Sequence, residues 1–252
     1  IQGNIPQEKK WDNAYKDEIF ENYLEMTREA LLNKPDVVIW PESATPFLFI
    51  RDQHYSRKLL DFVSQERFFL LFGGDYLKVE RENYRVFNSA FLLSPEGKIL
   101  GRYDKNHLVP FGEYVPLKNL LFFVNKMVVG DLDYSAGKEL NVLSIPKGLF
   151  GVQICYEVIF PELSRILAQK GAQFIAVVTN DAWFGPSSAP YQHFSMVVFR
   201  AIETRLPFVR AANTGISGSI DQMGRILSAS PLFTKGVYSD EIRLLDRDAT
   251  FY

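Results

Sequence analysis

The chain has 252 residues, of which 47% are hydrophobic and 23% are charged. This balance is typical of a folded globular protein and excludes an extended disordered chain. The net charge is −2 and the lysines and arginines are scattered, so we expect no nucleic acid among the partners.

The first part of the chain alternates between helical and strand-like patterns. Apolar residues recur at helical spacing over residues 12–34, and a buried strand is expected over 37–40. A second helix is expected around 59–63, before a strand over 68–72 that a pair of glycines should close. Two strand-like runs within 87–103 flank a turn sequence and predict a hairpin.

The second part continues this alternation after residues 107–141, an unusually apolar loop-like region. We expect strands over 150–156, 174–179, 208–212 and 236–244, a hairpin over 217–227, and helices over 161–170 and around 194–202. Without a repeat or a linker, the pattern predicts one α/β domain over 1–252 with a mixed sheet.

The two ends of the chain are abrupt. It begins with Ile1 rather than Met and stops at Tyr252 without a polar tail. The sequence contains no run of 18 or more apolar residues, the length that a membrane-spanning helix needs. We therefore expect a fragment of a longer protein, whose missing parts could still include membrane helices.

Three segments place a reactive side chain at the end of a predicted strand: Glu42, Lys105 and Cys155. A carboxylate at the rim of a sheet can act as a base, and an ammonium can face a developing oxyanion. A cysteine between a strand and a helix can serve as a nucleophile. Each residue alone has a simpler interpretation, as a surface glutamate, a solvated lysine or an inert buried cysteine. The three residues together indicate a catalytic site far more specifically than any one of them does.

These segments resemble, in the same order, the three motifs of the carbon–nitrogen hydrolase (nitrilase) superfamily. They are Trp-Pro-Glu at 40–42, Tyr-Asp-Lys-Asn-His-Leu at 103–108, and Cys-Tyr-Glu at 155–157 with Pro-Glu at 161–162. The resemblance covers nearly the whole chain. It implies a nitrilase-like αββα sandwich with mixed β-sheets and with the three residues at strand ends.

Further motifs resemble one branch of that superfamily, apolipoprotein N-acyltransferase. They lie at residues 2–7 with 10–11, 109–116, 179–185 and 210–218. The branch consists of bacterial inner-membrane enzymes whose nitrilase-like domain faces the periplasm. They move an acyl chain from a phospholipid to the free amine of a diacylglyceryl-cysteine lipoprotein. The resemblance thus implies these two partners, a membrane surface and no cofactor.

The resemblance also implies residue roles. Glu42 would be the base, Lys105 the oxyanion-stabilising cation, and Cys155 the nucleophile that carries a thioester. The backbone N–H of Tyr156 is expected to face the oxyanion as well. Glu113, Tyr156 and Glu157 match supporting residues of the branch, and Trp11 matches an aromatic residue bordering the substrate. For Glu113 and Trp11, fixing a loop and filling a packing position remain simpler interpretations.

Two apolar segments adjoin these motifs and could contact acyl chains. One spans residues 117–129 and includes Phe122 and Phe123, and the other spans 47–50. Either segment alone is more simply explained as core. Apolar surface flanked by lysines is nevertheless what a site for membrane-borne acyl chains requires, so we expect both to line the entrance to Cys155.

Three alternatives stay open at this point. The main one is a soluble amidase or nitrilase that hydrolyses a C–N bond with the same three residues, and another is a non-catalytic binding domain on the same fold. A cysteine–histidine pair would need His54, His107 or His193, of which His107 lies in the lysine motif. No metal site is expected, because the histidines lack ligand spacing.

Overall fold

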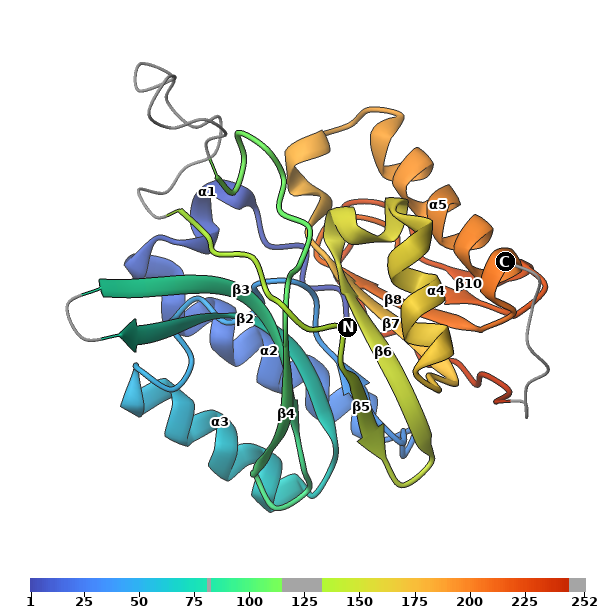
Figure 1. The fold of residues 1–252 in the computed structure, drawn as a ribbon. Helices are drawn as coiled ribbons and strands as arrows, with labels where there is room; N and C mark the ends of the chain where they lie inside the picture. The colour runs from blue at the N-terminus through green and yellow to red at the C-terminus, as the bar shows by residue number, and fades with distance from the viewer. Residues whose placement is uncertain (81–82, 115–132, 245–252) are drawn as a thin grey trace, which may run out of the picture.

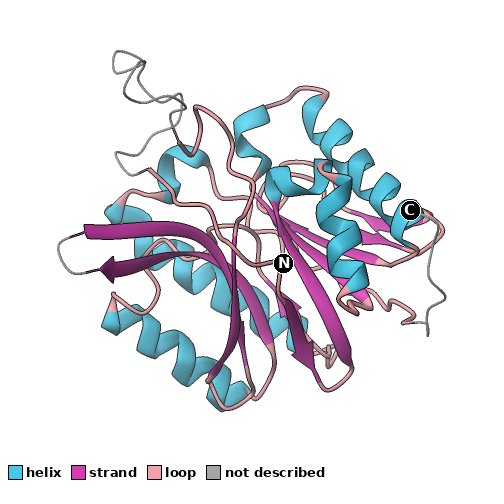
Figure 2. Cartoon of the chain, in the orientation of Figure 1, coloured by secondary structure: helices cyan, strands magenta, loops and turns pink. Residues whose placement is uncertain are grey.

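The structure is a computed structural model that describes residues 1–80, 83–114 and 133–244. Two β-sheets pack face to face, and helices cover the outer face of each sheet (Figure 1). The result is a four-layer αββα sandwich, which confirms the architecture predicted from the sequence (Figure 2). No helix within the described residues is long and apolar enough to cross a membrane.

The first sheet has the strand order β1-β2-β3-β4. Its strands are β1 (Val38–Ile39), β2 (Leu70–Glu80), β3 (Asn83–Leu93) and β4 (Ile99–Asp104). β1 and β2 are parallel, whereas β2, β3 and β4 form an antiparallel meander. Its outer face is covered by α2 (Lys16–Leu31) and α3 (Gln53–Glu66), and the short helices α1 (Gln7–Lys10) and η1 (Asn13–Tyr15) precede them.

The second sheet has the order β10-β9-β8-β7-β6-β5. Its strands are β5 (Val142–Ile145), β6 (Gly148–Ile154), β7 (Phe174–Thr179), β8 (Phe208–Ala212), β9 (Gly218–Ile220) and β10 (Ile226–Ala229). The central strands β6, β7 and β8 are parallel, and the outer strands are antiparallel. The helices α4 (Pro161–Gln169) and α5 (Ala189–Thr204) cover its outer face, while η2 (Cys155–Ile159) and η3 (Asp181–Phe184) follow β6 and β7.

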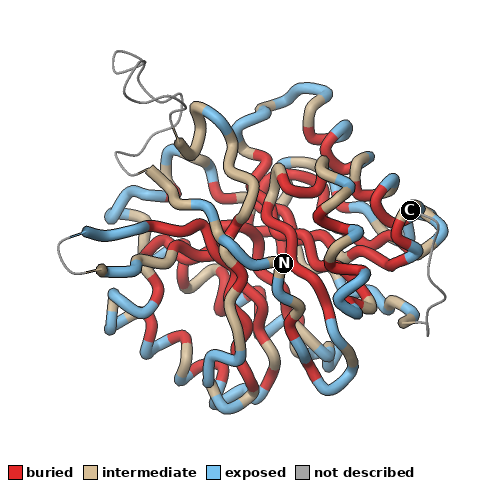
Figure 3. Tube along the Cα trace, in the orientation of Figure 1, coloured by how far each residue is buried: buried red, intermediate tan, exposed pale blue. Residues whose placement is uncertain are grey.

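Strand alternation builds the apolar layers, because successive side chains point to opposite faces. Leu71 and Leu92 of the first sheet pack with Val152 and Ile154 of the second in one buried cluster between the sheets. Neighbouring residues such as Phe72 face the opposite way, into a cluster with α2 and α3. Figure 3 shows this buried interior running through both sheets. Strands β1, β4, β6 and β7 consequently deliver the residues that follow them to one edge of the sandwich.

Two sequence predictions about strands were wrong. The glycine pair Gly73-Gly74 does not close a strand, because β2 continues to Glu80. A Cβ on Gly73 would lie 2.6 Å from the Cα of Glu42, so the close approach of another segment requires this glycine. The strand expected over 236–244 is also absent from the described chain, where Gly236 forms only an isolated bridge to Gln2. The strand β5 was not anticipated.

Candidate active site

Glu42 lies three residues beyond β1 and is buried, with 7% of its surface exposed. Asn88 Nδ2 donates a hydrogen bond to Oε1 at 2.7 Å, and the backbone N–H of Asn180 donates to Oε2 at 2.8 Å. Lys10 Nζ donates to the backbone carbonyl of Glu42 at 3.0 Å. Two separate segments therefore fix the direction in which this carboxylate points, and Lys10 holds its backbone.

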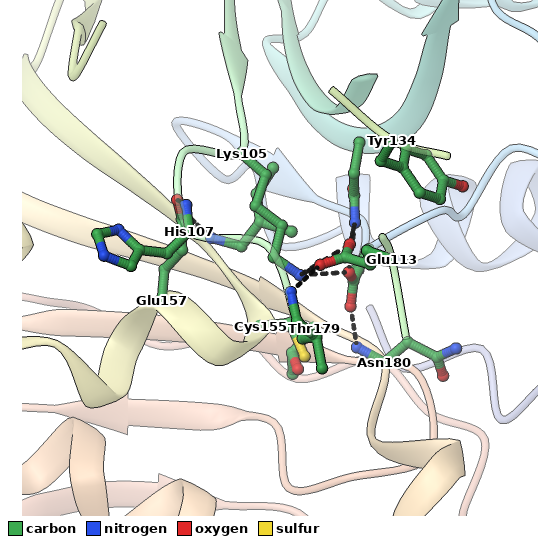
Figure 4. A network of polar contacts seen from close by, with 12 residues as sticks. Lys105, His107, Glu113, Tyr134, Cys155, Glu157, Thr179 and Asn180 are labelled. Atoms are coloured by element: carbon green, nitrogen blue, oxygen red, sulfur yellow. Dashed lines mark hydrogen bonds and ion pairs between the residues drawn. The ribbon is translucent and has the colours of Figure 1, made fainter. Parts of the chain in front are cut away.

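Lys105 directly follows β4 and is buried rather than solvated, with 1% of its surface exposed. Its Nζ donates to Glu113 Oε1 at 3.0 Å and lies 3.6 Å from Glu42 Oε1 (Figure 4). Burial lowers the pKa of Lys105, but the carboxylates of Glu42 and Glu113 outweigh this and hold the pKa above its ordinary value. The side chain is therefore a permanent cation at neutral pH.

Cys155 is the residue immediately after β6, and its φ of 52° places it in the left-handed region. For a residue other than glycine this backbone conformation costs on the order of 1 kcal/mol, and such strain gathers at functional sites. The side chain is half-buried beside Thr179 (Figure 4). Burial and the charge of Glu42 raise the pKa of the thiol to about 12, although Lys105 opposes them. The thiol is thus protonated in the free protein.

Glu157 is fully buried and joins the lysine loop to the end of β6. Its Oε1 accepts hydrogen bonds from the Tyr103 hydroxyl at 2.7 Å and from the backbone N–H groups of Asn106 at 2.7 Å and His107 at 3.1 Å. Its Oε2 accepts from the backbone N–H of Ile154 at 2.8 Å. The side chain therefore holds two segments together.

Glu113 contacts more than its own loop. Its Oε2 accepts from the backbone N–H of Val109 at 2.8 Å, while its Oε1 accepts from Asn88 at 2.9 Å and from Lys105. Tyr156 packs its ring edge-on against Phe160, with centroids 5.2 Å apart. The two supporting residues thus differ, since only Glu113 contacts Lys105.

The predicted apolar entrance needs one correction. Phe47 and Phe49 are core residues, exposed by 4% and 0%, because their rings pack edge-on against Phe20 and Phe72. Residues 47–50 therefore do not form an open apolar loop, although Ile50 is exposed. Residues 117–129, with Phe122 and Phe123, lie outside the described residues.

Trp11 follows α1 and is 41% exposed. Gln7 of the same helix accepts a hydrogen bond from Asn180 Nδ2 at 2.9 Å, which ties α1 to the segment that contacts Glu42. Trp183 and Phe184, in η3 just after Asn180, are exposed by 46% and 38%. Three exposed aromatic residues thus lie in or directly after the short helices α1 and η3.

Among the histidines, His193 contacts the backbone of Cys155, its Nε2 lying 3.1 Å from the carbonyl oxygen. Its Nδ1 lies 3.0 Å from Asp181 Oδ1, and Arg210 donates to Asp181 Oδ2 at 2.6 Å. Although burial raises the pKa of Asp181, Arg210 and His193 outweigh this and lower it to about 2. This chain of polar contacts positions the backbone at Cys155.

The remaining histidines are placed differently. His107 stacks on Phe160 with centroids 4.2 Å apart, and His54 packs against Tyr55 in α3. Within residues 1–80, 83–114 and 133–244, no group of histidine, cysteine and carboxylate side chains is arranged to hold a metal ion.

Sequence reasoning missed several residues of this site. Asn180, Asp181 and Arg210 lie in motifs that were noticed without a role being assigned to them. Asn88 and Asp75 lie inside the long β2–β3 hairpin, where no local pattern distinguishes them from other polar strand residues. Only the three-dimensional contacts with the carboxylates of the site reveal them.

Comparisons with known proteins give a consistent result. The model of the carbon–nitrogen hydrolase family matches residues 1–250. An apolipoprotein N-acyltransferase of Geobacter metallireducens is 47% identical over 245 residues, which cover 97% of this chain and 47% of that protein. One from Allorhizobium ampelinum is 39% identical, covering 94% of this chain and 46% of its own length. The chain therefore spans about half the length of the curated relatives it matches.

Solved structures share the fold. The Caenorhabditis elegans NitFhit protein superimposes with a TM-score of 0.69 at 22% identity, over 86% of this chain and 55% of that one. A mutant of the amidase from Nesterenkonia sp. AN1, with an acetamide moiety covalently added at its active-site cysteine, gives 0.65 at 18% identity, over 92% and 84% of the two chains. At such identities the likeness concerns the fold.

Proposed function

The chain belongs to the carbon–nitrogen hydrolase family, and from that premise we propose that it is the catalytic domain of an apolipoprotein N-acyltransferase. In this proposal, residues 1–252 form a single domain of a longer bacterial inner-membrane protein, and the domain faces the periplasm. The identity with relatives of that name supports the proposal. The observation that carries the thiol-based acyl-transfer chemistry is the Lys105 ammonium held between two carboxylates, within electrostatic reach of the only thiol.

The first half-reaction follows from the charges around Cys155. A thiol with a pKa near 12 is not ionised at neutral pH, so Glu42 takes the proton as sulfur attacks the ester carbonyl of a phospholipid. Lys105 and the backbone N–H of Tyr156 face the oxyanion, where losing one donor costs about 3–4 kcal/mol. The C–O bond then breaks, Glu42 returns the proton to the lysophospholipid oxygen, and a thioester remains on Cys155.

The second half-reaction transfers the acyl group to the amine of a diacylglyceryl-cysteine lipoprotein. The amine gives a proton to Glu42 and attacks the thioester, so that the C–N bond forms as the C–S bond breaks. Of the two protons that the original ammonium loses, one re-protonates the Cys155 thiol and the other leaves to solvent. No cofactor or metal is needed for this cycle.

The exposed aromatic residues support a lipid as acyl donor. An acyl chain loses about 0.8 kcal/mol of favourable burial for each CH₂ group that water surrounds. Trp11, Trp183 and Phe184 offer apolar surface in or directly after α1 and η3, which the contact of Asn180 with Gln7 and with Glu42 connects to the site. A small polar amide would need no such surface.

The test uses the full-length protein and a phospholipid with a labelled acyl chain. Mass spectrometry should find one acyl group on Cys155 that hydroxylamine removes, and a diacylglyceryl-cysteine peptide should then receive it. The Cys155→Ala protein should acquire no label. A wild-type protein that hydrolyses small amides but never becomes acylated by phospholipid would instead be an amidase.

A further inference from the structure

The inner face of the first sheet changes character along β2 and β3. Register pairs on this face run from Leu71 with Leu92, through Gly73 with Ala90, to Asp75 with Asn88. The first pair belongs to the apolar cluster between the sheets. Asp75 and Asn88 are also buried, being exposed by 5% and 4%. A polar pair therefore interrupts this face beside Glu42 and Glu113, to which Asn88 donates hydrogen bonds.

The same pair carries two hydrogen-bond acceptors without donors. Asn88 Nδ2 donates to the carboxylates of Glu42 and Glu113, which fixes the orientation of the amide and leaves Oδ1 on its other side. Asp75 Oδ2 accepts from the Tyr134 hydroxyl at 2.8 Å. Neither Asn88 Oδ1 nor Asp75 Oδ1 accepts a hydrogen bond from any residue that the structure describes. Buried acceptors rarely stay unpaired, so this arrangement suits a ligand rich in N–H groups.

The charges around the pair favour a cation. Three carboxylates (Glu42, Glu113 and Asp75) face two ammonium groups (Lys10 and Lys105), which leaves one negative charge in excess when all five are ionised. Burial raises the pKa of Asp75 to about 7, although the hydroxyl of Tyr134 opposes it. An arriving cation would favour the ionised form and balance the excess charge.

We propose that Asp75 and Asn88 bind the ammonium group of the acyl acceptor through Asp75 Oδ1 and Asn88 Oδ1. This inference rests on the proposed acyltransferase function and assigns the acceptor its own subsite. A primary ammonium brings three N–H donors and one positive charge, which match both acceptors and the excess charge. Because Asn88 Nδ2 lies 2.7 Å from Glu42 Oε1, the bound amine is next to the group that must take its proton.

The experiment compares two nucleophiles on the same acyl-enzyme. Full-length protein is acylated with labelled phospholipid, and the thioester is then consumed either by a diacylglyceryl-cysteine peptide or by hydroxylamine, which is mostly uncharged at neutral pH. Asp75→Asn should lower the ratio of peptide transfer to hydroxylamine cleavage at least tenfold, through a higher KM for the peptide. Asp221→Asn, which changes a buried carboxylate in the turn between β9 and β10, should keep the wild-type ratio.

Tyr134→Phe provides a milder second variant in case Asp75→Asn folds poorly. Without the hydroxyl, Asp75 is protonated more readily. The ratio of peptide transfer to hydroxylamine cleavage should therefore be lower than in the wild type at neutral pH and should recover as the pH is raised. Unchanged ratios in both variants, with wild-type protein completing both half-reactions, would overturn the ammonium site alone. A wild-type protein that never forms the thioester would overturn the proposed function and this inference with it.

Discussion

Replacing Glu157 by Gln tests whether one buried carboxylate holds the lysine loop and the cysteine strand together. Glutamine keeps the size of the side chain but has one acceptor oxygen and an NH₂ group. If the oxygen stays with Tyr103, Asn106 and His107, the NH₂ group faces the N–H of Ile154, and two donors meet.

The expected loss can be worked from these four contacts. A hydrogen bond to a charged acceptor contributes about 1.5–3 kcal/mol against about 1 kcal/mol for a neutral one, so three weakened bonds cost about 3 kcal/mol. The unpaired N–H of Ile154 adds about 1–3 kcal/mol. Burial of the charged Glu157 side chain is itself unfavourable and raises its pKa. The neutral glutamine avoids this cost, which offsets part of the sum. We expect the free energy of unfolding to fall by about 3 kcal/mol.

Urea unfolding followed by tryptophan fluorescence measures this loss, and single-turnover acylation of Cys155 measures its effect on the reaction. A displacement of the lysine loop by about 1 Å should slow acylation roughly 10²-fold. Glu96→Gln, at an exposed turn, is the control and should change stability by less than about 0.5 kcal/mol. Wild-type stability together with wild-type acylation in Glu157→Gln would refute this explanation of the buried carboxylate.

Three further outcomes are expected. The alkylation rate of Cys155 by iodoacetamide should rise about tenfold per pH unit from pH 7 to pH 10 without a plateau. The reason is that a thiol of pKa about 12 is ionised to only about one part in 10⁵ at pH 7. A plateau near neutrality would contradict this. Lys105→Met should slow single-turnover acylation roughly 10²–10³-fold by removing one oxyanion partner, and a near-normal rate would exclude that role. The lowered pKa of Asp181 means that its carboxylate stabilises the fold above its ordinary pKa of 3.8 and that this stability is lost as the pH falls towards 2. Asp181→Asn should therefore cost about 2 kcal/mol at pH 7 and flatten the acid limb of urea-measured stability, whereas an acid limb as steep as that of the wild type would contradict the linkage.

The apolar runs predicted an α/β domain and the strand-end positions of Glu42, Lys105 and Cys155, because such runs mark buried strands. The αββα layers came from the resemblance to the nitrilase superfamily. The sequence did not predict the course of β2, since a glycine in a strand cannot be distinguished from a turn glycine without knowing which segment passes over it. That segment carries Glu42, which lies 31 residues before Gly73 in the chain.

For the apolar run over residues 47–50, the sequence could not distinguish exposed surface from core. Its composition fits a membrane contact as well as a core. Only the packing of its two phenylalanines against Phe20 and Phe72 shows that it belongs to the core. Asp75 and Asn88 escaped notice for a related reason. Their polar character becomes informative only once the cross-strand register places them opposite each other on a face whose preceding pairs are apolar.

The division of the site between two sheets has a consequence for how this protein can change over time. Glu42 and Lys105 follow strands of the first sheet and Cys155 follows a strand of the second, so the apolar layer between the sheets acts as a spacer that sets their alignment. Enlarging Ala90 or Ala176 in that layer would push the sheets apart as well as strain the interior. Substitutions there are constrained by reaction geometry in addition to stability, and the helix-covered outer faces have more freedom to drift.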